Sequence, residues 1–247
     1  MKRRSVLAGL AGLFTAGCSK ISDSEAFGGL VQGAESLHRG AQRLLSPRRP
    51  SMAREFTLAD ISPDFRGNGN VDVETDAYQT SLASGFRDWR LDVRGLVEKP
   101  LSLSLEELRA MPQRTQITRH DCVEGWSAIG QWTGPQLSQL IERAGGLKPE
   151  ARFIVFRCAD SFRDAAYYES CDLDDAMHPQ TIVAHALNGE PLPVKNGAPL
   201  RMRIERQLGY KHAKYLTAIE AVASLDGIGE GRGGYWEDRG YQWYAGM

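Results

Sequence analysis

Residues 119–127 read Arg119-His120-Asp121-Cys122-Val123-Glu124-Gly125-Trp126-Ser127, and Cys122 is the most informative side chain of the sequence. The preceding residues, 113–118, are predicted to form a strand that delivers Cys122 to its end. A lone cysteine beside a histidine has four interpretations: core packing, a Cys–His nucleophile, part of a zinc site, or a ligand of a softer metal. No CxxC pair accompanies it, which weighs against zinc. The surrounding charges weigh against an inert thiol, and Arg119 with a protonated His120 would favour the thiolate.

Outward from this stretch, the sequence alternates between strand patterns and short helix patterns. The expected strands are a half-buried strand over 90–97 and a strand core over 153–156, and a hairpin is expected at Asn188-Gly189. One helix is expected to open with a capping box at 104–107 and to end near Met111-Pro112. A second helix is expected to have Pro135 in its first turn and to end at Gly145-Gly146, with one apolar face made of Leu137, Leu140, Ile141 and Ala144. Many strands with a few short helices predict one α+β domain over residues 51–247.

A basic segment follows, in which residues 200–204 alternate between apolar and charged side chains. Arg201 and Arg203 are predicted to share one strand face. The basic side chains that accompany them are Arg206, Lys211, His212 and Lys214. They form either an anion cradle or a solvated face paired with acidic neighbours, and the residues alone favour the solvated face.

The last residues, 231–247, place aromatic side chains among glycines. The aromatic residues are Tyr235, Trp236, Tyr241, Trp243 and Tyr244. They are expected to close the core as a final strand, or else to line a site or a partner surface, and core closure is favoured.

The N-terminus has the features of an export signal. Arg3-Arg4 precedes an apolar run to Gly17 that is too short to span a bilayer, so residues 1–17 are interpreted as a twin-arginine-type signal. The expected location is therefore the periplasm. Thr15-Ala16-Gly17-Cys18 resembles a lipoprotein cleavage site, so a lipid anchor at Cys18 is the one membrane attachment considered. Residues 18–50 are interpreted as a tether, either a helix over 24–45 or a linker.

Charge and cysteine content narrow the classes of function. The chain has 247 residues and a formal net charge of -1, which gives no electrostatic reason to expect nucleic-acid binding. Of its cysteines, Cys158 and Cys171 could form a disulfide, and the sequence leaves this open.

Several segments in this order resemble the sulfite-oxidase-type molybdopterin family, in particular its bacterial exported branch, which includes periplasmic methionine-sulfoxide reductase. The resemblance runs from Phe56 to the C-terminus. Besides residues 119–126 it rests on Trp132-Thr133-Gly134, Ala176-Met177-His178-Pro179-Gln180-Thr181, Asn188-Gly189-Glu190-Pro191-Leu192-Pro193, Asn196-Gly197-Ala198-Pro199-Leu200-Arg201 and Gly209-Tyr210-Lys211-His212-Ala213-Lys214. It implies the sulfite-oxidase-type fold and one Mo-molybdopterin per chain.

The resemblance also implies roles for individual residues. Cys122 is the single protein ligand of molybdenum. The residues that hold the pterin are Asn68, Cys158, Asn196 and Arg201, although relatives carry a small hydroxyl residue where Cys158 stands. The residues that bind the terminal phosphate are Lys211, His212, Ala213 and Lys214. The residues that flank the reaction site, with proton-transfer or structural roles, are His120, Asp121 and Glu124.

A departure from the sulfite oxidases directs the choice of substrate. Those enzymes carry Ala-Gly-Asn-Arg after the cysteine, and their arginines help to bind an anion, whereas this chain has Val-Glu-Gly-Trp at 123–126. We therefore expect two-electron oxygen-atom transfer, with reduction of a small-molecule or protein S-oxide, or of an N-oxide, favoured over sulfite oxidation. No CxxCH motif is present, so electrons should pass to or from a separate redox protein such as a cytochrome. The immunoglobulin-like dimerisation domain of plant and animal relatives has no room in this chain, so a monomer is expected.

Two other classes of function stay open. One is a cysteine hydrolase that uses Cys122 with His120 or His185. The other is a non-catalytic lipoprotein that retains the fold.

Overall fold

The structure is a computed structural model that describes residues 34, 37, 40, 41, 51–163 and 165–247. The chain divides into two compact units, Met1–Arg49 and Pro50–Met247. The predicted signal segment and the lipidation site at Cys18 lie outside the described residues. Of the predicted tether over 18–50, four residues before residue 51 are described, and all four are helical and exposed. Among the described residues, no helix combines the length and apolar character needed to cross a membrane.

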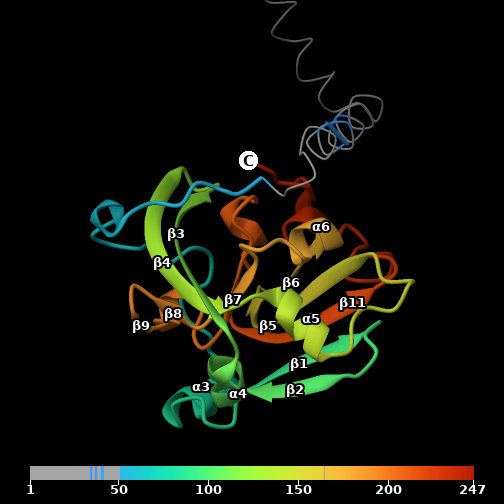
Figure 1. Ribbon diagram of the computed structural model, residues 1–247, viewed down its shortest axis with the longest axis horizontal. Coiled ribbons are helices and arrows are strands. Elements are labelled where there is room, and N and C mark those ends of the chain that lie inside the picture. The colour runs from blue at the N-terminus through green and yellow to red at the C-terminus, as the bar shows by residue number, and fades with distance from the viewer. Residues whose placement is uncertain (1–33, 35–36, 38–39, 42–50, 164) are drawn as a thin grey trace, which may run out of the picture. The chain divides into compact units, whose positions relative to one another are not determined.

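Strands dominate the second unit, and its helices are short (Figure 1). The strands are β1 (Arg90–Gly95), β2 (Leu101–Ser104), β3 (Gln113–Cys122), β4 (Trp126–Pro135), β5 (Phe153–Phe162), β6 (Ala165–Asp172), β7 (Ile182–Ala184), β8 (Ala186–Leu187), β9 (Glu190–Pro191), β10 (Arg201–Arg203) and β11 (Leu216–Val222). The helices are α3 (Asp76–Ala83), α4 (Leu105–Ala110), α5 (Leu137–Arg143) and α6 (Leu173–Ala176), with short 3₁₀ turns η1 (Leu58–Asp60), η2 (Val194–Asn196), η3 (Gly209–Lys211) and η4 (Glu237–Arg239). The predicted α+β domain, made mostly of strands, is confirmed.

A mixed sheet in the order β2-β1-β11-β5-β6 holds the main core. Its neighbouring strands are antiparallel except for β1 and β11, which run parallel. Because side chains alternate across a strand, Leu91 and Val93 of β1 enter the core, and Ile154 and Phe156 of β5 meet them there. Complete burial of side chains of this size contributes about 1.5–3 kcal/mol each.

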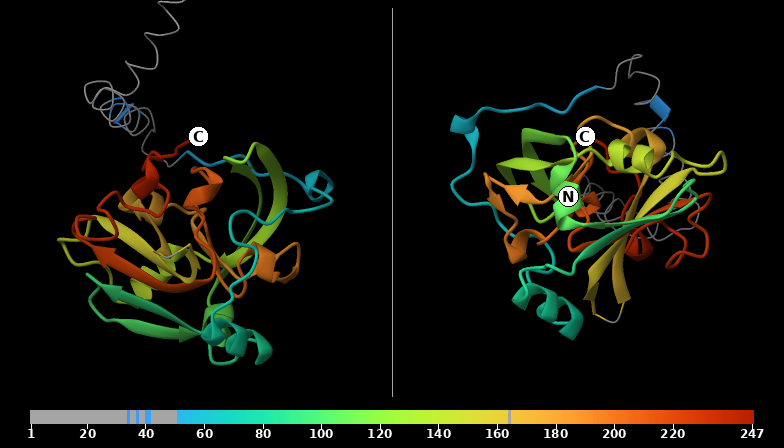
Figure 2. Two further views of the ribbon diagram at one scale, coloured as in Figure 1. Left: turned by 180° about the vertical axis from the view of Figure 1, so that it is seen from behind. Right: turned by 60° about the horizontal axis from the view of Figure 1, so that its bottom comes forward.

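The β3–β4 hairpin is the long curved arm on the other side of the unit (Figure 1). Its register runs from Gln113 opposite Pro135 to Cys122 opposite Trp126. Strands β8 and β9 extend its sheet, and β7 contacts both β4 and β10. Gly134 permits this approach, because a Cβ at that position would overlap the backbone carbonyl of Val183. Two further views show the hairpin beside the five-stranded sheet rather than stacked flat on it (Figure 2).

Local sequence signals account for most element boundaries. Ser104 caps α4: its side chain accepts from the Glu107 amide at 3.1 Å, and the Glu107 carboxylate accepts from the Ser104 amide at 2.8 Å, which confirms the predicted capping box. Asn188 and Gly189 both have positive φ, as the predicted hairpin requires. Pro135 was wrongly expected inside a helix. It ends β4, and Gln136 is the N-cap of α5.

The C-terminal residues, 231–247, do not form the expected final strand. Their only regular element is η4, apart from one β-bridge between Gln207 and Gly246. Glycines at positive φ, among them Gly233 and Gly240, interrupt any extended run. Tyr235 nevertheless packs into a small core with Tyr168, so the aromatic burial predicted for this segment is partly confirmed.

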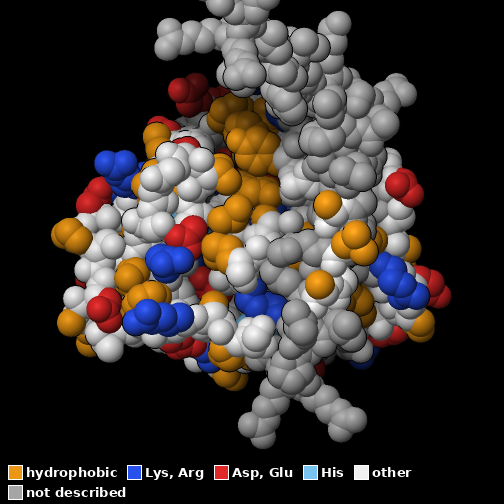
Figure 3. Space-filling view, turned by 90° about the horizontal axis from the view of Figure 1, so that it is seen from above, with side chains coloured by type: hydrophobic (Ala, Val, Ile, Leu, Met, Phe, Trp, Pro, Cys, Tyr) orange, Lys and Arg blue, Asp and Glu red, His pale blue; other side chains and the backbone are white. Residues whose placement is uncertain are grey.

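The surface seen from above mixes charges of both signs (Figure 3). A band of hydrophobic side chains crosses the part of this face that the structure describes, with basic and acidic groups on either side. This face therefore shows no broad patch of one charge.

Candidate functional site

Cys122 lies at the end of β3, where the chain reverses into β4. The Gly125 amide donates to the Cys122 carbonyl at 3.1 Å, and Gly125 has a φ of 86°, which favours glycine at this turn. The half-buried thiol lines a cavity. Burial raises the pKa of this thiol, and the nearby Glu124 carboxylate adds to the increase.

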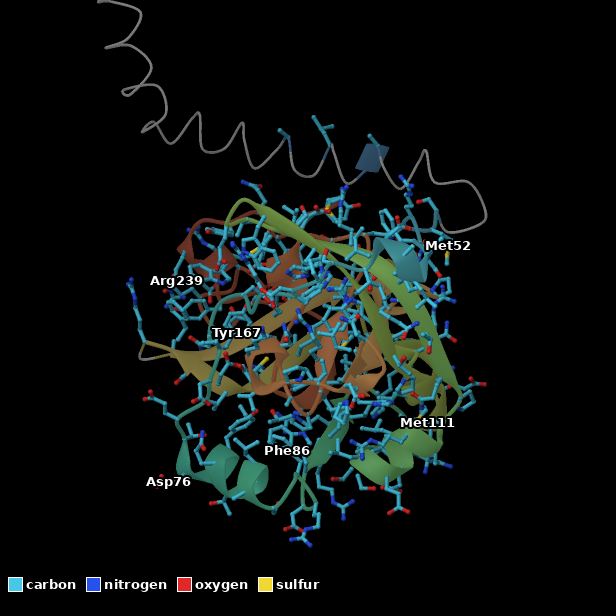
Figure 4. All side chains as sticks on the ribbon, turned by 90° about the vertical axis from the view of Figure 1, so that its left-hand side faces the viewer. Met52, Asp76, Phe86, Met111, Tyr167 and Arg239 are labelled. Atoms are coloured by element: carbon cyan, nitrogen blue, oxygen red, sulfur yellow. The ribbon has the colours of Figure 1, made fainter. Side chains whose placement is uncertain are left out.

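Segments distant in the sequence form the walls of the Cys122 cavity. Its polar side chains are Asn68, Asn70, Glu124, Asp160, His212 and Lys214. Its aromatic side chains are Phe162, Tyr167, Tyr210, Trp236 and Tyr241. Tyr167, on β6, lies inside the unit on the side that also carries Arg239 (Figure 4). The C-terminal segment thus supplies two rings to the cavity, Trp236 and Tyr241, which stack with centroids 5.3 Å apart.

Arg201 carries a buried charge with no carboxylate at ion-pair distance among the described residues. Its Nη1 donates to the Asn196 carbonyl at 3.0 Å and its Nη2 to the His212 carbonyl at 3.4 Å. Across residues 51–163 and 165–247 it forms no ion pair, and its Nε has no hydrogen-bond partner. Burial, followed by the neighbouring Arg203, lowers the pKa of Arg201 to about 9. A buried cation without a counter-ion favours the binding of an anion.

Lys214 adds a second such charge at the cavity wall. Its Nζ donates to the backbone carbonyls of Asn70 and Lys195. Burial, followed by the charge of Arg201, lowers the pKa of Lys214 to about 7. Bringing an anion close to both groups would restore their ordinary charged state, so the predicted anion cradle fits the geometry better than the solvated face.

Two other basic residues of the same segment are already neutralised. The Arg203 guanidinium binds Glu205 at two points, 2.9 and 2.6 Å. Lys211 lies between two buried carboxylates, Glu169 at 2.8 Å and Glu237. The Lys211 ammonium group faces these carboxylates and does not line the cavity, so its pairing does not support the prediction that Lys211 binds the phosphate.

Buried polar atoms without partners cluster among the predicted cofactor-binding residues. They are Asn68 Oδ1, Asn196 Oδ1, Arg201 Nε and His212 Nδ1. Such atoms are costly in a folded protein unless a ligand or water satisfies them. The set combines three acceptors with one cationic donor, Arg201 Nε, which suits a pterin ring system, whose nitrogens can donate, and the phosphate that it carries. The residues present therefore fit molybdopterin.

The surroundings of His120 do not allow the charged state that was expected for it. Its Nδ1 lies 3.0 Å from Nη1 of Arg203, and because a guanidinium can only donate, Nδ1 accepts and the ring is neutral. Burial, followed by the charge of Arg203, holds the pKa of His120 well below its ordinary range. The expectation that a protonated His120 stabilises the Cys122 thiolate is therefore wrong.

The arrangement also gives no support to a cysteine hydrolase. His185 hydrogen-bonds to Gln113 at 2.9 Å, at the far end of β3 from Cys122. Neither His120 nor His185 hydrogen-bonds to the Cys122 thiol in the part of the chain that the structure describes.

The charged neighbours of Cys122 separate onto two sides of the hairpin. Asp121 accepts from Arg119 Nε at 2.9 Å and lines another surface hollow, not the Cys122 cavity. The exposed Arg119 likewise lies on that side. Glu124 lies at the cavity, as predicted, where its carboxylate accepts from Trp126 Nε1 at 2.9 Å and from the Gly69 amide at 3.5 Å.

The remaining predicted residues lie just behind the cavity wall. Asn196 is buried, and its Nδ2 donates to the carbonyl of Arg66 at 3.1 Å. Ala213 is buried beside the lining residues His212 and Lys214. Cys158 is a free thiol that does not line the cavity, and burial raises its pKa well above the ordinary range.

The disulfide considered between Cys158 and Cys171 is not formed. In the β5–β6 register, Cys171 stands opposite Ile154 rather than Cys158. The spacing of the two cysteines in the sequence gave no information on this register.

Asp160 and Tyr167 are cavity residues that the sequence did not indicate. Asp160 lies on β5, and Tyr167 lies on the adjacent strand β6. A single aspartate or tyrosine in a strand pattern carries no signal of this kind, because only the strand geometry brings it to the cavity.

Known proteins are similar to this chain over more than half of its length. The chain is 42% identical over 158 residues to "Putative protein-methionine-sulfoxide reductase subunit YedZ1" of Azospira oryzae, covering 64% of this chain and 56% of that protein. It is 36% identical over 156 residues to the protein-methionine-sulfoxide reductase catalytic subunit MsrP of Campylobacter jejuni, covering 57% and 52%. The chain therefore spans about half the length of the curated relatives it matches.

A solved structure has a similar fold. The sulfane dehydrogenase SoxCD of Paracoccus pantotrophus superposes with a TM-score of 0.52 at 25% identity, over 56% of this chain and 39% of that one. The profile of the family described as "Oxidoreductase molybdopterin binding domain" matches residues 78–226, which span the sheet, the hairpin with Cys122, and the basic segment. The chain belongs to this family of molybdopterin-binding oxidoreductase domains.

Proposed function

We propose that this protein is an exported molybdopterin-dependent oxidoreductase that reduces S-oxides by two-electron oxygen-atom transfer. The single observation that carries the proposal is a pair of buried cations without an ion-pair partner among the described residues: Lys214 in the lining of the Cys122 cavity, and Arg201, whose charge acts on the Cys122 thiol. A cavity of this charge, with a thiol at one wall, fits an anionic cofactor whose metal takes a sulfur ligand.

Different residues hold different parts of this cofactor. Cys122 supplies the sulfur ligand from the turn of a rigid hairpin, which limits its movement. Arg201 and Lys214 balance the phosphate, and Asn68 and Asn196 offer unpartnered amide oxygens to the pterin. When bound, molybdopterin supplies two-electron redox chemistry and oxygen-atom transfer.

The cavity wall favours a neutral substrate over an anion such as sulfite. Glu124 contributes a carboxylate to the lining, and the same lining contains aromatic rings, with Trp236 and Tyr241 stacked on each other. An aromatic wall can pack against the apolar groups of a sulfoxide, whereas a carboxylate repels sulfite. The two curated relatives bear names of protein-methionine-sulfoxide reductases, which supports an S-oxide, in a protein or a small molecule.

We further propose that a separate redox protein, such as a cytochrome, supplies the electrons, and that the protein works in the periplasm as a monomer. The sequence support for export is Arg3-Arg4 with the short apolar run that follows, and Cys18 would give a lipid anchor if it is processed. Comparing the mature mass and the membrane fraction of wild type with those of Cys18→Ser tests the anchor.

The decisive experiment replaces the sulfur ligand. Wild type, expressed with its leader in a molybdenum-replete host, should contain molybdenum and pterin and should reduce a sulfoxide with a reduced dye. Cys122→Ser should lose at least about 10²-fold in kcat, because removing the ligand changes the environment of the metal. Cys171→Ser, at a buried cysteine of the main core that is assigned no part in the site, is the matched control and should keep most of the activity.

Other outcomes of the same experiment point to other functions. Metal-free wild type would contradict the proposal and favour a non-catalytic protein that retains the fold. Faster oxidation of sulfite with an oxidised dye than reduction of any sulfoxide or N-oxide would overturn the choice of substrate.

A further inference from the structure

Asp160 lies in a wall shared by two hollows. One is the Cys122 cavity, and the other is a polar hollow at the surface formed by residues 70–75, 160, 161 and 163. Asn70 and Asp160 are the two residues that line both. Asp160 itself is only 5% exposed, so its carboxyl group separates the cavity from the surface.

An irregularity of β5 puts Asp160 in this position. Arg157 pairs with Tyr168 and Ser161 with Ala166, so β5 has four steps where β6 has two, and the extra residues of β5 bulge. Within the bulge, the Ala159 amide donates to the Tyr215 carbonyl at 2.8 Å, which fixes the backbone next to Asp160. Bulges redirect side chains and are common beside active sites.

The Asp160 carboxyl group is only half satisfied. Its Oδ2 accepts from Asn70 Nδ2 at 2.9 Å, while its Oδ1 is buried without a partner. Burial raises the pKa of Asp160, and the Asn70 hydrogen bond and the charge of Lys214 oppose this increase. The titratable groups that interact with it are Cys158 on the same strand and, from other segments, Lys214, Tyr78, Tyr167 and Tyr215.

We propose that Asp160 carries protons between the polar surface hollow and the Cys122 cavity during turnover. This inference rests on the proposed function. Reduction of a sulfoxide, R₂S=O + 2H⁺ + 2e⁻ → R₂S + H₂O, takes two electrons from the redox partner and two protons from water. Asp160 donates one of these protons on the cavity side, towards the oxygen that leaves as water. It then regains a proton from solvent through the hollow lined by Asn70.

The first test observes the carboxyl group without turnover. Infrared spectra recorded along a pH titration should contain a protonated-carboxyl C=O band that is lost in Asp160→Asn and retained in Glu74→Gln, an exposed residue of the same hollow. The band should disappear on titration at a pH above that of exposed aspartates. It should also shift on transfer to D₂O, because the hollow connects this group with solvent.

The second test measures its part in turnover. In molybdenum-loaded protein, Asp160→Asn should lower kcat for sulfoxide reduction by about 10²-fold, the usual size of a lost general acid. It should also remove the fall in kcat at rising pH, which in wild type follows deprotonation of Asp160. Asp160→Glu should recover part of the rate, and Glu74→Gln should behave as wild type.

The results separate this inference from the proposed function. An Asp160→Asn variant that is fully loaded and keeps both the wild-type kcat and its pH profile would overturn the inference, and so would one that loses molybdenum, which indicates a structural role. If loaded wild type reduces no sulfoxide, the proposed function fails, and the infrared test decides alone. A band that is absent or does not exchange in D₂O then overturns the inference, and an exchanging band supports it.

Discussion

Arg201 and Arg203 lie two residues apart on one face of β10, and both guanidinium groups lie over the ring of Trp132, at 5.0 and 4.4 Å. Only Arg203 has a carboxylate partner, Glu205. The alternating pattern of the sequence predicted their common face. It could not distinguish their partners, because Arg203 meets its own near neighbour whereas Arg201 points to backbone carbonyls.

This difference predicts opposite effects of matched substitutions. Arg203→Met leaves Glu205 as an unbalanced buried charge and should reduce the free energy of unfolding by about 3–5 kcal/mol. Arg201→Met removes an unbalanced charge, so the cofactor-free protein should lose less stability, while the purified protein should lose its molybdenum. Chemical denaturation and metal analysis of both variants test this. Equal losses of stability would contradict the assignment of Arg201 as the anion-binding residue.

Lys214 predicts a pH dependence of the cofactor-free protein. Its folded pKa of about 7 lies below its ordinary value of 10.5, so between these values the unfolded chain binds more protons. The free energy of unfolding should therefore rise with pH across this window. The destabilisation caused by the buried Lys214 charge should be complete below about pH 7. Lys214→Met should abolish this contribution. Unfolding midpoints of wild type and variant, measured from pH 6 to pH 10 at constant ionic strength, should converge at the alkaline end, and parallel curves would argue against it.

At the scale of elements, the sequence correctly predicted those features that depend on contacts between residues close in the sequence. The capping box of α4, the Asn-Gly hairpin and the apolar face of α5 all involve neighbours within a few residues, and the sequence predicted each of them. The bulge in β5 was not predictable, because it depends on the register with β6 and on the Tyr215 carbonyl. The prediction that Pro135 lies in a helix was wrong for a related reason, because its pairing with Gln113 keeps it in β4.

The capping box gives a quantitative prediction for α4. Ser104→Ala removes the side chain that accepts from the Glu107 amide and should lower the free energy of unfolding by about 1 kcal/mol. Ser102→Ala, two residues earlier and exposed on β2, should change it by less than about 0.5 kcal/mol. Equal effects of the two substitutions in urea denaturation would exclude a capping role.

At the scale of the molecule, the site is assembled from segments that span residues 68 to 241. The sequence supplied Cys122, Asn196, Arg201 and Lys214 through motifs of known order. It could not show that the Lys211 ammonium is held by Glu169 and Glu237, since these partners come from two other segments. Charged residues are assigned correctly from sequence only when their partners are local, or when the family pattern already identifies a ligand.

An assembly that joins distant segments should be stabilised by what it binds. Cofactor-loaded wild type should unfold at a higher temperature than the cofactor-free protein, because a ligand that binds only the folded state adds RT ln(1 + [L]/Kd). Both forms are obtained by expression in a host supplied with molybdenum and in a host deprived of it. Arg201→Met expressed in the same two hosts should show no such difference. Calorimetry of the four samples tests this, and a loading-dependent shift that persists in the variant would place the cofactor elsewhere.

Gly209 has a consequence for how these sequences can change over evolution. A Cβ at this position would overlap the imidazole of His120, so the turn that leads to His212 rests directly on the strand that carries Cys122. The two positions therefore constrain each other as a pair. A lineage that gains a side chain at 209 should carry a smaller residue at 120. The substitution at 120 should come first, because a side chain at 209 would otherwise clash with the imidazole.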